Sequence, residues 1–179
     1  MQLSKRERVR RAILRQPLDH LPTQTNYTAN MGKLLCYHLT VSPAQLPERL
    51  GNHLLRVDID QQAPLSQDGT VRYDWWGAGW STKTEGYWLA LAALADTADP
   101  HPIPWPDPNG PGLMDRAQQA IAANKSQCFV VPNLGFCLFE RAWSLRGYEQ
   151  LNYEMETDLH WVEDILERIT AKKIVIIGR

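Results

Sequence analysis

The feature that most constrains the fold is a short apolar run, residues 128–132, which leads through a glycine-containing loop into a helix-forming segment that ends near Gly147. This order is typical of a strand–loop–helix unit. In parallel α/β folds, ligands bind where strands end and helices begin. Glu140, Arg141 and Arg146 occupy that region of the sequence, so they are candidates for catalysis or binding.

A second strand is predicted at residues 54–60, which are apolar at first and acidic at the carboxyl end, where Asp58 and Asp60 lie. Between the two strands, residues 113–124 carry a helical apolar stripe that ends at Asn124. Strands that alternate with helices favour an α/β fold with a parallel sheet. Asp58 is therefore a second candidate at a strand end.

The remaining chain predicts further elements. Ser4 and Glu7 form a capping-box pattern, so a helix is expected there, and its arginine-rich face, which includes Arg8, is expected to be solvated. Residues 22–47 favour a pair of short helices, and the last clear helix starts at Asp158. Six of the twelve prolines lie in residues 99–112, which predicts an extended connector.

Aromatic residues gather in the segment that follows the first predicted strand. A turn signal at residues 67–70 and the flanking sequence predict a hairpin. Its neighbourhood holds four tryptophans: Trp75, Trp76, Trp80 and Trp88. They can line the mouth of a ligand pocket, because flat rings stack on sugars or macrocycles, or they can plug one end of the core. Trp76, together with Trp143, is a candidate for substrate contact.

Composition excludes several classes of function. A net charge of -1 with 22% charged residues argues against a nucleic-acid platform. No apolar run approaches the roughly 20 residues that span a bilayer, and the charged N-terminus is unlike a signal peptide, so no membrane partner and a cytoplasmic location are expected. The three cysteines form no C-x-x-C pair and show no metal-ligand spacing with His53 or His160. His53 is expected to be a hydrogen-bonded structural residue.

The segment from Phe139 to Gly147 resembles the F-E-x-A-x-x-L-R-G run of the uroporphyrinogen decarboxylase-like superfamily, in its methyltransferase-type branch. Further similar pieces follow in family order: an opening helix at residues 6–9 that closes on 19–22, then residues 73–77, 105–108 and 158–169. Together they cover most of the chain.

The resemblance implies a (β/α)8 TIM barrel, which takes roughly 250 residues, of which residues 1–170 would form about the first half. A partial barrel with an N-terminal helical extension and an aromatic-rich hairpin is therefore expected, with residues 171–179 as an atypical tail. That tail is either a misjoined end or a short strand. The leading expectation is a fragment of a longer enzyme.

Two activities follow from the resemblance. The decarboxylases of tetrapyrrole biosynthesis place an aspartate at the end of their first barrel strand, similar to Asp58 here, where it holds the pyrrole nitrogens and stabilises the protonated ring. In the alternative, Asp58 caps a turn. These enzymes also carry an M-R-Q-A-G-R motif, which is absent here, and a tyrosine at the position of Trp143. The cobamide-dependent methyltransferase branch therefore matches better.

Within that branch, Asp58 and Glu140 are the predicted catalytic residues, and Arg141, Arg146, Trp76 and Trp143 the predicted substrate-binding residues. The arginines and Glu140 have a structural alternative, in which ion pairs brace the loop. The resemblance implies zinc in the full-length enzyme, with ligands outside this chain, so no cofactor is expected in the chain itself. The expected partners are a tetrapyrrole or corrinoid-linked substrate and a corrinoid protein. A non-catalytic binding module, completed as a homodimer or by another subunit, is the remaining alternative.

Overall fold

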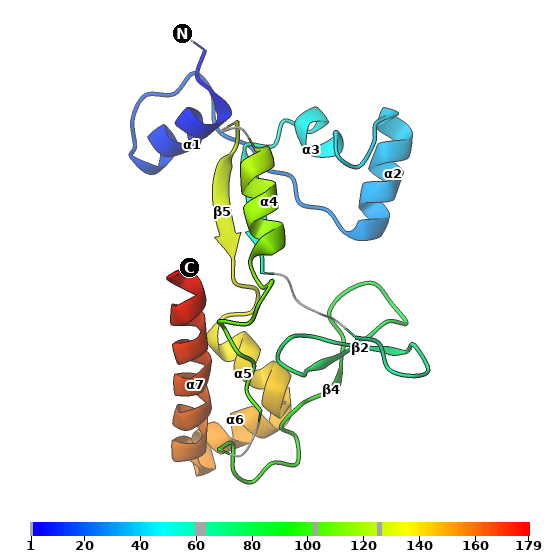
Figure 1. Cartoon of the computed structure of the whole chain (residues 1–179), viewed down its shortest axis with the longest axis vertical. Coiled ribbons are helices and arrows are strands. Elements are labelled where there is room, and N and C mark those ends of the chain that lie inside the picture. Colours follow the sequence, from blue (N-terminus) through cyan, green and yellow to red (C-terminus); the bar gives the residue numbers. More distant parts are fainter. Residues whose placement is uncertain (1, 60–63, 102–103, 125–126) are drawn as a thin grey trace. The chain divides into compact units, whose positions relative to one another are not determined.

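The computed structural model of the chain describes residues 2–59, 64–101, 104–124 and 127–179, and divides into two compact units. Unit 1 comprises Met1–Asp58 and Asp115–Asn133, and unit 2 comprises Ile59–Met114 and Leu134–Arg179. The chain therefore passes from unit 1 to unit 2 and back again before it ends in unit 2 (Figure 1).

Unit 1 contains most of the helices predicted for the first half of the chain. Ser4 caps the first of these helices, where its hydroxyl oxygen accepts a hydrogen bond from the Glu7 amide at 3.2 Å, as the capping-box pattern predicts. The predicted pair of short helices at residues 22–47 is also present, although the second helix begins only at Leu46 and extends to Arg49. In chain order, the elements of unit 1 are α1 (Lys5–Ile13), α2 (Ala29–Leu39), α3 (Leu46–Arg49), β1 (Leu54–Asp58), α4 (Asp115–Ala123) and β5 (Phe129–Asn133).

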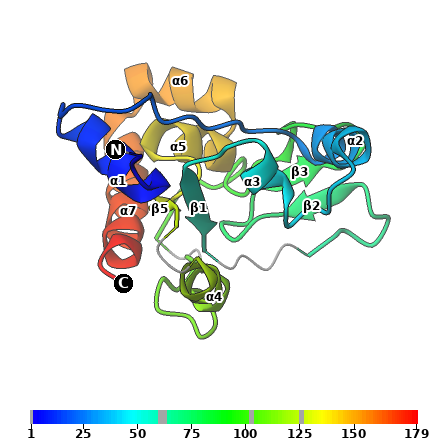
Figure 2. The same cartoon turned by 90° about the horizontal axis from the view of Figure 1, so that it is seen from above.

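The two predicted strands pair in parallel, with Leu54 opposite Phe129 and Asp58 opposite Asn133. α4 contacts β1 and α1 contacts β5, which gives the unit a strand–helix–strand core. Figure 2 shows β1 and β5 beside one another. Asp60, the second acidic residue predicted at this strand end, lies outside the described residues.

A buried polar cluster links α1 to the rest of unit 1. Arg8 is buried, its guanidinium donates to both carboxylate oxygens of Asp19 at 2.7 Å, and it lies 2.7 Å from Nε2 of His53. The prediction that the arginine face of α1 is solvated is therefore wrong for Arg8, because Asp19 and His53 enclose it. The prediction that His53 is a hydrogen-bonded structural residue is confirmed, since its other ring nitrogen lies 2.8 Å from the Gly51 carbonyl.

Unit 2 combines a small antiparallel sheet with a helical layer. The predicted hairpin is present as β2 and β3, with Arg72 opposite Trp80, and β4 pairs antiparallel with β3. Figure 2 shows β2 and β3 at the edge of the unit. The elements of unit 2 are β2 (Val71–Tyr73), β3 (Gly79–Ser81), β4 (Leu89–Leu91), α5 (Leu138–Arg146), α6 (Tyr148–Thr157) and α7 (Leu159–Ile177).

The apolar core of unit 2 forms where α5, α6 and α7 pack together, and it receives Trp76 from the hairpin. Ile165 and Ile169 of α7 have no exposed surface, and Leu145 and Leu151 are almost as deeply buried. The apolar stripe predicted for the helix after Asp158 is thus the buried face of α7. Proline-rich residues 99–112 form no helix or strand in their described part, as predicted for a connector.

The fold is mixed α/β, as expected, but a partial barrel is not seen. The described residues contain one parallel pair, β1 and β5, and a separate three-stranded antiparallel sheet. The expected tail at residues 171–179 does not contain a strand, because α7 continues without a break to Ile177. Among the described residues, no helix combines the length and apolar character that crossing a bilayer requires.

Candidate functional site

The carboxyl edge of the parallel pair in unit 1 carries Asp58. β1 and β5 run in the same direction, so their last residues, Asp58 and Asn133, lie opposite each other. The side-chain amide of Asn133 donates to Oδ1 of Asp58, and Nε of Arg56 lies 3.9 Å from the same oxygen. Asp58 is exposed, so its carboxylate is accessible to a ligand at the edge where parallel sheets bind ligands.

Asn133 was not predicted from the sequence. It follows Pro132, which looked like the end of the apolar run, and only the pairing of two strands far apart in the chain places it opposite Asp58. Its amide orients the carboxylate by holding Oδ1.

In unit 2, Arg141 is held by Asp74, at the start of the turn between β2 and β3. Oδ2 of Asp74 accepts from Arg141 at 2.6 Å and from the Trp80 indole at 3.1 Å. Oδ1 accepts from the amides of Trp76 and Ala78 at 2.9 and 3.0 Å. One carboxylate thus orders the hairpin turn and fixes the arginine. The sequence motif around Asp74 was noted, but its pairing with Arg141 was not predicted.

The Arg141 guanidinium lies between two aromatic rings, 5.2 Å from the centroid of Trp76 and 5.5 Å from that of Phe136. Burial lowers the pKa of Arg141 below its ordinary value, and the nearby Asp74 carboxylate offsets part of this effect. Nε of Arg141 is buried and has no hydrogen-bond partner among the described residues. A second cation, Lys173, lies 5.8 Å from the Trp76 centroid and donates to the Leu134 carbonyl at 2.9 Å.

Arg146 is enclosed by protein acceptors. Its Nε donates to Glu154 at 2.8 Å and its Nη2 donates to the same carboxylate. Its Nη1 donates to three carbonyl oxygens of the segment that follows β4, those of Leu94, Ala95 and Thr97, the last at 2.8 Å. The guanidinium also stacks 4.2 Å from the Trp161 centroid. These contacts are of the kind expected if Arg146 forms a structural ion pair and does not bind substrate.

Glu140 and Trp143 lie on α5 in different surroundings. Glu140 is exposed in the first turn, and no ion pair is found for it within the described part of the chain. Trp143 is half-buried, with ring centroids 6.1 Å from Trp80 and 5.8 Å from Phe136. Of the predicted site residues in unit 2, Arg141 therefore contacts Trp76. Both Arg141 and Trp143 contact Phe136, whereas Glu140 is exposed to solvent.

The aromatic contacts continue from the interior of unit 2 to its surface. Centroid distances of 5.4 to 6.4 Å link a chain of six rings: Trp80, Tyr87, Phe136, Phe139, Trp143 and Tyr148. Trp80 is buried, while Tyr87 and Tyr148 are 77% and 59% exposed. Trp76 lies in the core, as expected if the tryptophan cluster plugs one end of it, and the alternative that the cluster lines a ligand pocket stays a prediction.

The described residues offer no ligand set for zinc. No group of three or more His, Cys, Asp or Glu side chains is placed to hold a metal ion within the part of the chain that the structure describes. The three cysteines are free thiols. The zinc chemistry that the resemblance implies cannot be assigned to these residues.

Comparisons with known proteins identify no relative: no family model matches the chain, and no curated protein and no solved structure shows significant similarity to it. The family resemblance therefore rests on the sequence motifs alone.

Proposed function

We propose that this protein belongs to the uroporphyrinogen decarboxylase-like superfamily and acts in its cobamide-dependent methyltransferase-type branch, with Asp58 as the acidic residue of the active-site edge. The observation that carries this proposal is the pairing of Asp58 with Asn133 at the carboxyl ends of two parallel strands. A partial (β/α)8 barrel is part of the same proposal. The parallel pair and its connecting helix α4 are consistent with it.

Asp58 is suited to binding a group that carries N–H donors or positive charge. Its Oδ1 is held by Asn133, and an ionised carboxylate has further lone pairs for charge-assisted hydrogen bonds. A corrin ring carries amide side chains, and these provide N–H donors of the required kind. In this proposal, Asp58 orients the macrocycle and does not itself transfer the methyl group.

Unit 2, taken by itself, offers a separate candidate surface for a flat ligand, formed by aromatic rings. Trp143 and Tyr148 are 6.4 Å apart and lie near the surface. Flat macrocycles stack on such rings, and stacking is stabilising because it buries large apolar areas. Trp143 is thus the proposed substrate-contacting aromatic residue, and Arg141 is a positioning residue that supports Phe136 beside it.

The test is a titration of the full chain with hydroxocobalamin, followed by corrinoid absorbance and by tryptophan fluorescence. We expect saturable binding that Asp58→Asn weakens by about tenfold or more, since a hydrogen bond to a charged group contributes roughly 1.5–3 kcal/mol. Asp115→Asn, at an exposed position on α4, is the matched control and should bind like the unchanged chain. Equal affinities for the two variants would refute the role of Asp58.

The decarboxylase alternative is tested in the same format with uroporphyrinogen in place of the corrinoid. Release of carbon dioxide that depends on Asp58, without methyl transfer from methylcobalamin to a thiol, would favour it. The absence of the arginine-rich motif of the decarboxylases makes this the second choice.

A non-catalytic binding module is the other candidate, and the exposed aromatic surface favours it. Tyr87 and Tyr148 are largely exposed although they contact other rings, so their faces are accessible to a ligand. Tetrapyrrole binding that Trp143→Ala abolishes and Asp58→Asn leaves unchanged, with no turnover, would identify this function.

A further inference from the structure

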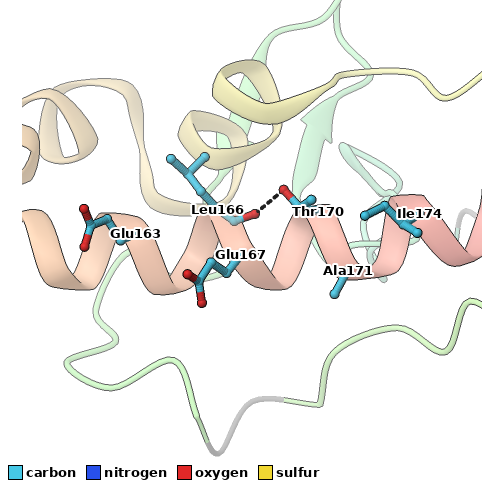
Figure 3. A pocket seen from close by; sticks show the side chains of 6 residues that line it. All are labelled: Glu163, Leu166, Glu167, Thr170, Ala171 and Ile174. Atoms are coloured by element: carbon cyan, nitrogen blue, oxygen red, sulfur yellow. Dashed lines mark hydrogen bonds between the residues drawn. The ribbon is translucent and has the colours of Figure 1, made fainter.

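The outer face of α7 forms an open groove of about 470 Å³, which we call the α7 groove. Figure 3 shows its lining residues in a row along the helix: Glu163, Leu166, Glu167, Thr170, Ala171 and Ile174. Glu163 and Glu167 lie at one end of the row. Ile174 lies at the other end and is 62% exposed, although large apolar side chains on a helix normally face the core.

The side chains that line the α7 groove differ in size. Thr170 and Ala171 are small, and the Thr170 hydroxyl donates to the Leu166 carbonyl of its own helix at 2.7 Å, so its polar atom is satisfied (Figure 3). Leu166 and Ile174 stand on either side of these two residues. The face therefore has a depression between two larger apolar side chains, and two carboxylates on the side nearer the start of α7.

α1 in unit 1 presents an exposed face of the opposite character, which we call the α1 face. It consists of Arg6, Arg10 and Ile13 of the helix and of Leu14, which caps its C-terminal end; Ile13 and Leu14 are 64% and 50% exposed. Residues at these spacings lie on one side of a helix. Arg10 approaches Glu7 of its own helix at 3.8 Å, a long surface ion pair that contributes little.

The two faces match in spacing as well as in charge. Glu163 and Glu167 are four positions apart, as are Arg6 and Arg10, and three and four positions further come Thr170 and Ala171 on α7 and Ile13 and Leu14 on α1. If the two helices lie parallel, each arginine stands opposite a glutamate. The two large side chains of the α1 face then stand opposite the two small residues of the groove.

We propose that the α7 groove binds the α1 face of a second copy of this chain. The charge pattern gives the direction of docking, and the depression at Thr170 and Ala171 gives the register. Pairing of two α7 grooves with each other is less favourable, because it brings the Glu163 and Glu167 carboxylates against like charges or against apolar residues. This inference does not depend on the proposed function.

Each copy carries both surfaces, so two copies either exchange contacts in a closed dimer or continue into a longer assembly. In either case, association depends on chain concentration. It also weakens with added salt, because surface ion pairs are screened.

Charge reversal tests the proposal. We expect the unchanged chain to associate reversibly in sedimentation equilibrium or in size-exclusion chromatography with light scattering. The double variant Glu163→Arg/Glu167→Arg, and separately Arg6→Glu/Arg10→Glu, should each weaken association by at least about tenfold, because like charges then face one another. Glu149→Arg/Glu156→Arg, a matched reversal on exposed positions of α6, should associate like the unchanged chain.

Mixing gives the decisive result. When the two weakened variants are combined, each reversed helix meets a helix of opposite charge on the other chain, so association should return to the original level. Recovery also shows that both variants are folded, and far-UV circular dichroism provides a second check. A chain that stays monomeric at every concentration, association that neither reversal changes, or a mixture that stays dissociated would each overturn the proposal.

Discussion

At the scale of single residues, the stability of unit 2 depends on a charge that the fold has enclosed. Arg146 and Glu154 are both buried, and the guanidinium links α5 and α6 to the segment after β4 through carbonyl oxygens such as that of Thr97. Arg146→Met should lower the free energy of unfolding by about 3–5 kcal/mol, because it leaves the Glu154 carboxylate buried without its partner. Urea denaturation measures the loss.

Two further variants distinguish the loss of an ion pair from the burial of an unpaired charge. Arg168→Met removes a helix-surface pair with Asp164, which spans 2.9 Å, and should cost only about 0.3–0.5 kcal/mol. Arg146→Met/Glu154→Met leaves no unpaired charge and should recover part of the loss. If Arg146→Met cost no more than Arg168→Met, the enclosed pair would not have the structural role assigned to it.

Asp19 gives unit 1 a stability that depends on pH. The Arg8 guanidinium, and then the amides of Leu3 and His20, hold the pKa of Asp19 far below its ordinary value. The unfolded chain takes up a proton at this residue near pH 4, whereas the folded chain keeps the carboxylate ionised. The free energy of unfolding should therefore fall as pH drops below about 4.

Asp19→Asn removes this contribution. The variant should be less stable at pH 7 and should lose less stability than the unchanged chain between pH 5 and pH 3, measured by urea denaturation at each pH. If the free energy of unfolding changed with pH in the same way for both proteins, the pH dependence would come from other groups, and the role given to Asp19 would be wrong.

The sequence predicts residue positions better than residue partners. The strand end at Asp58 and the structural role of His53 follow from local patterns, but Asn133 opposite Asp58 and Asp74 beside Arg141 do not. Both pairs join residues more than sixty positions apart. Such partners are set by tertiary packing, which helical and strand periodicity do not encode.

At the scale of elements, Gly147 separates α5 from α6. Its φ of 95° and ψ of 141° lie in a region that side chains with a Cβ rarely adopt. A Cβ at this position would meet no atom within 4 Å, so a substitution is strained by the backbone alone. Gly147→Ala should lower the free energy of unfolding by about 1–3 kcal/mol in urea denaturation.

Gly178→Ala is the matched control. Gly178 has a φ of -75°, and an added Cβ would lie at 3.6 Å from the nearest carbonyl oxygens, an ordinary contact. This variant should keep its stability or gain about 0.4–1 kcal/mol, because alanine restricts the unfolded chain. Equal effects of the two substitutions would argue against backbone strain at Gly147.

Elements that carry a capping residue, a turn signal or an apolar stripe were predicted, and two that lack such signals, β4 and α6, were missed. α1, α4, α5 and α7 follow from capping residues and apolar stripes, whereas β4 has only three residues and no alternation of its own. α6 was not predicted, since its first residue follows Gly147 directly and the glycine looks like the end of a helix and not the start of another. Residues 171–179 were expected to be an atypical tail because they depart from the family pattern, but α7 extends through them to Ile177.

At the scale of the whole molecule, fold class was predictable to the level of α/β and no further. The parallel pairing of β1 with β5 agrees with strand–helix alternation. A barrel requires more parallel strands in one sheet, and the described residues place β2, β3 and β4 in a separate antiparallel sheet. The hairpin signals were present in the sequence, but local turn chemistry does not say which sheet a hairpin joins.

The two units differ in how their interiors are built, and this difference predicts how the molecule unfolds. Unit 2 encloses an apolar cluster that includes Ile165 and Leu145, while the buried centre of unit 1 contains the polar group of Arg8 and His53. Apolar burial contributes more to stability than polar burial of similar extent. Unit 1 is therefore expected to unfold at a lower urea concentration than unit 2.

All seven tryptophans lie in unit 2, so tryptophan fluorescence reports that unit alone, whereas far-UV circular dichroism reports helices of both units. We expect the circular dichroism transition to begin at lower urea than the fluorescence transition, since two separate interiors need not unfold together. Asp19→Asn should move only the early part of the circular dichroism curve, and Gly147→Ala should move the fluorescence midpoint. Coincident curves that either variant displaces together would show that the chain unfolds as one cooperative body, and the difference between the two interiors would then have no thermodynamic consequence.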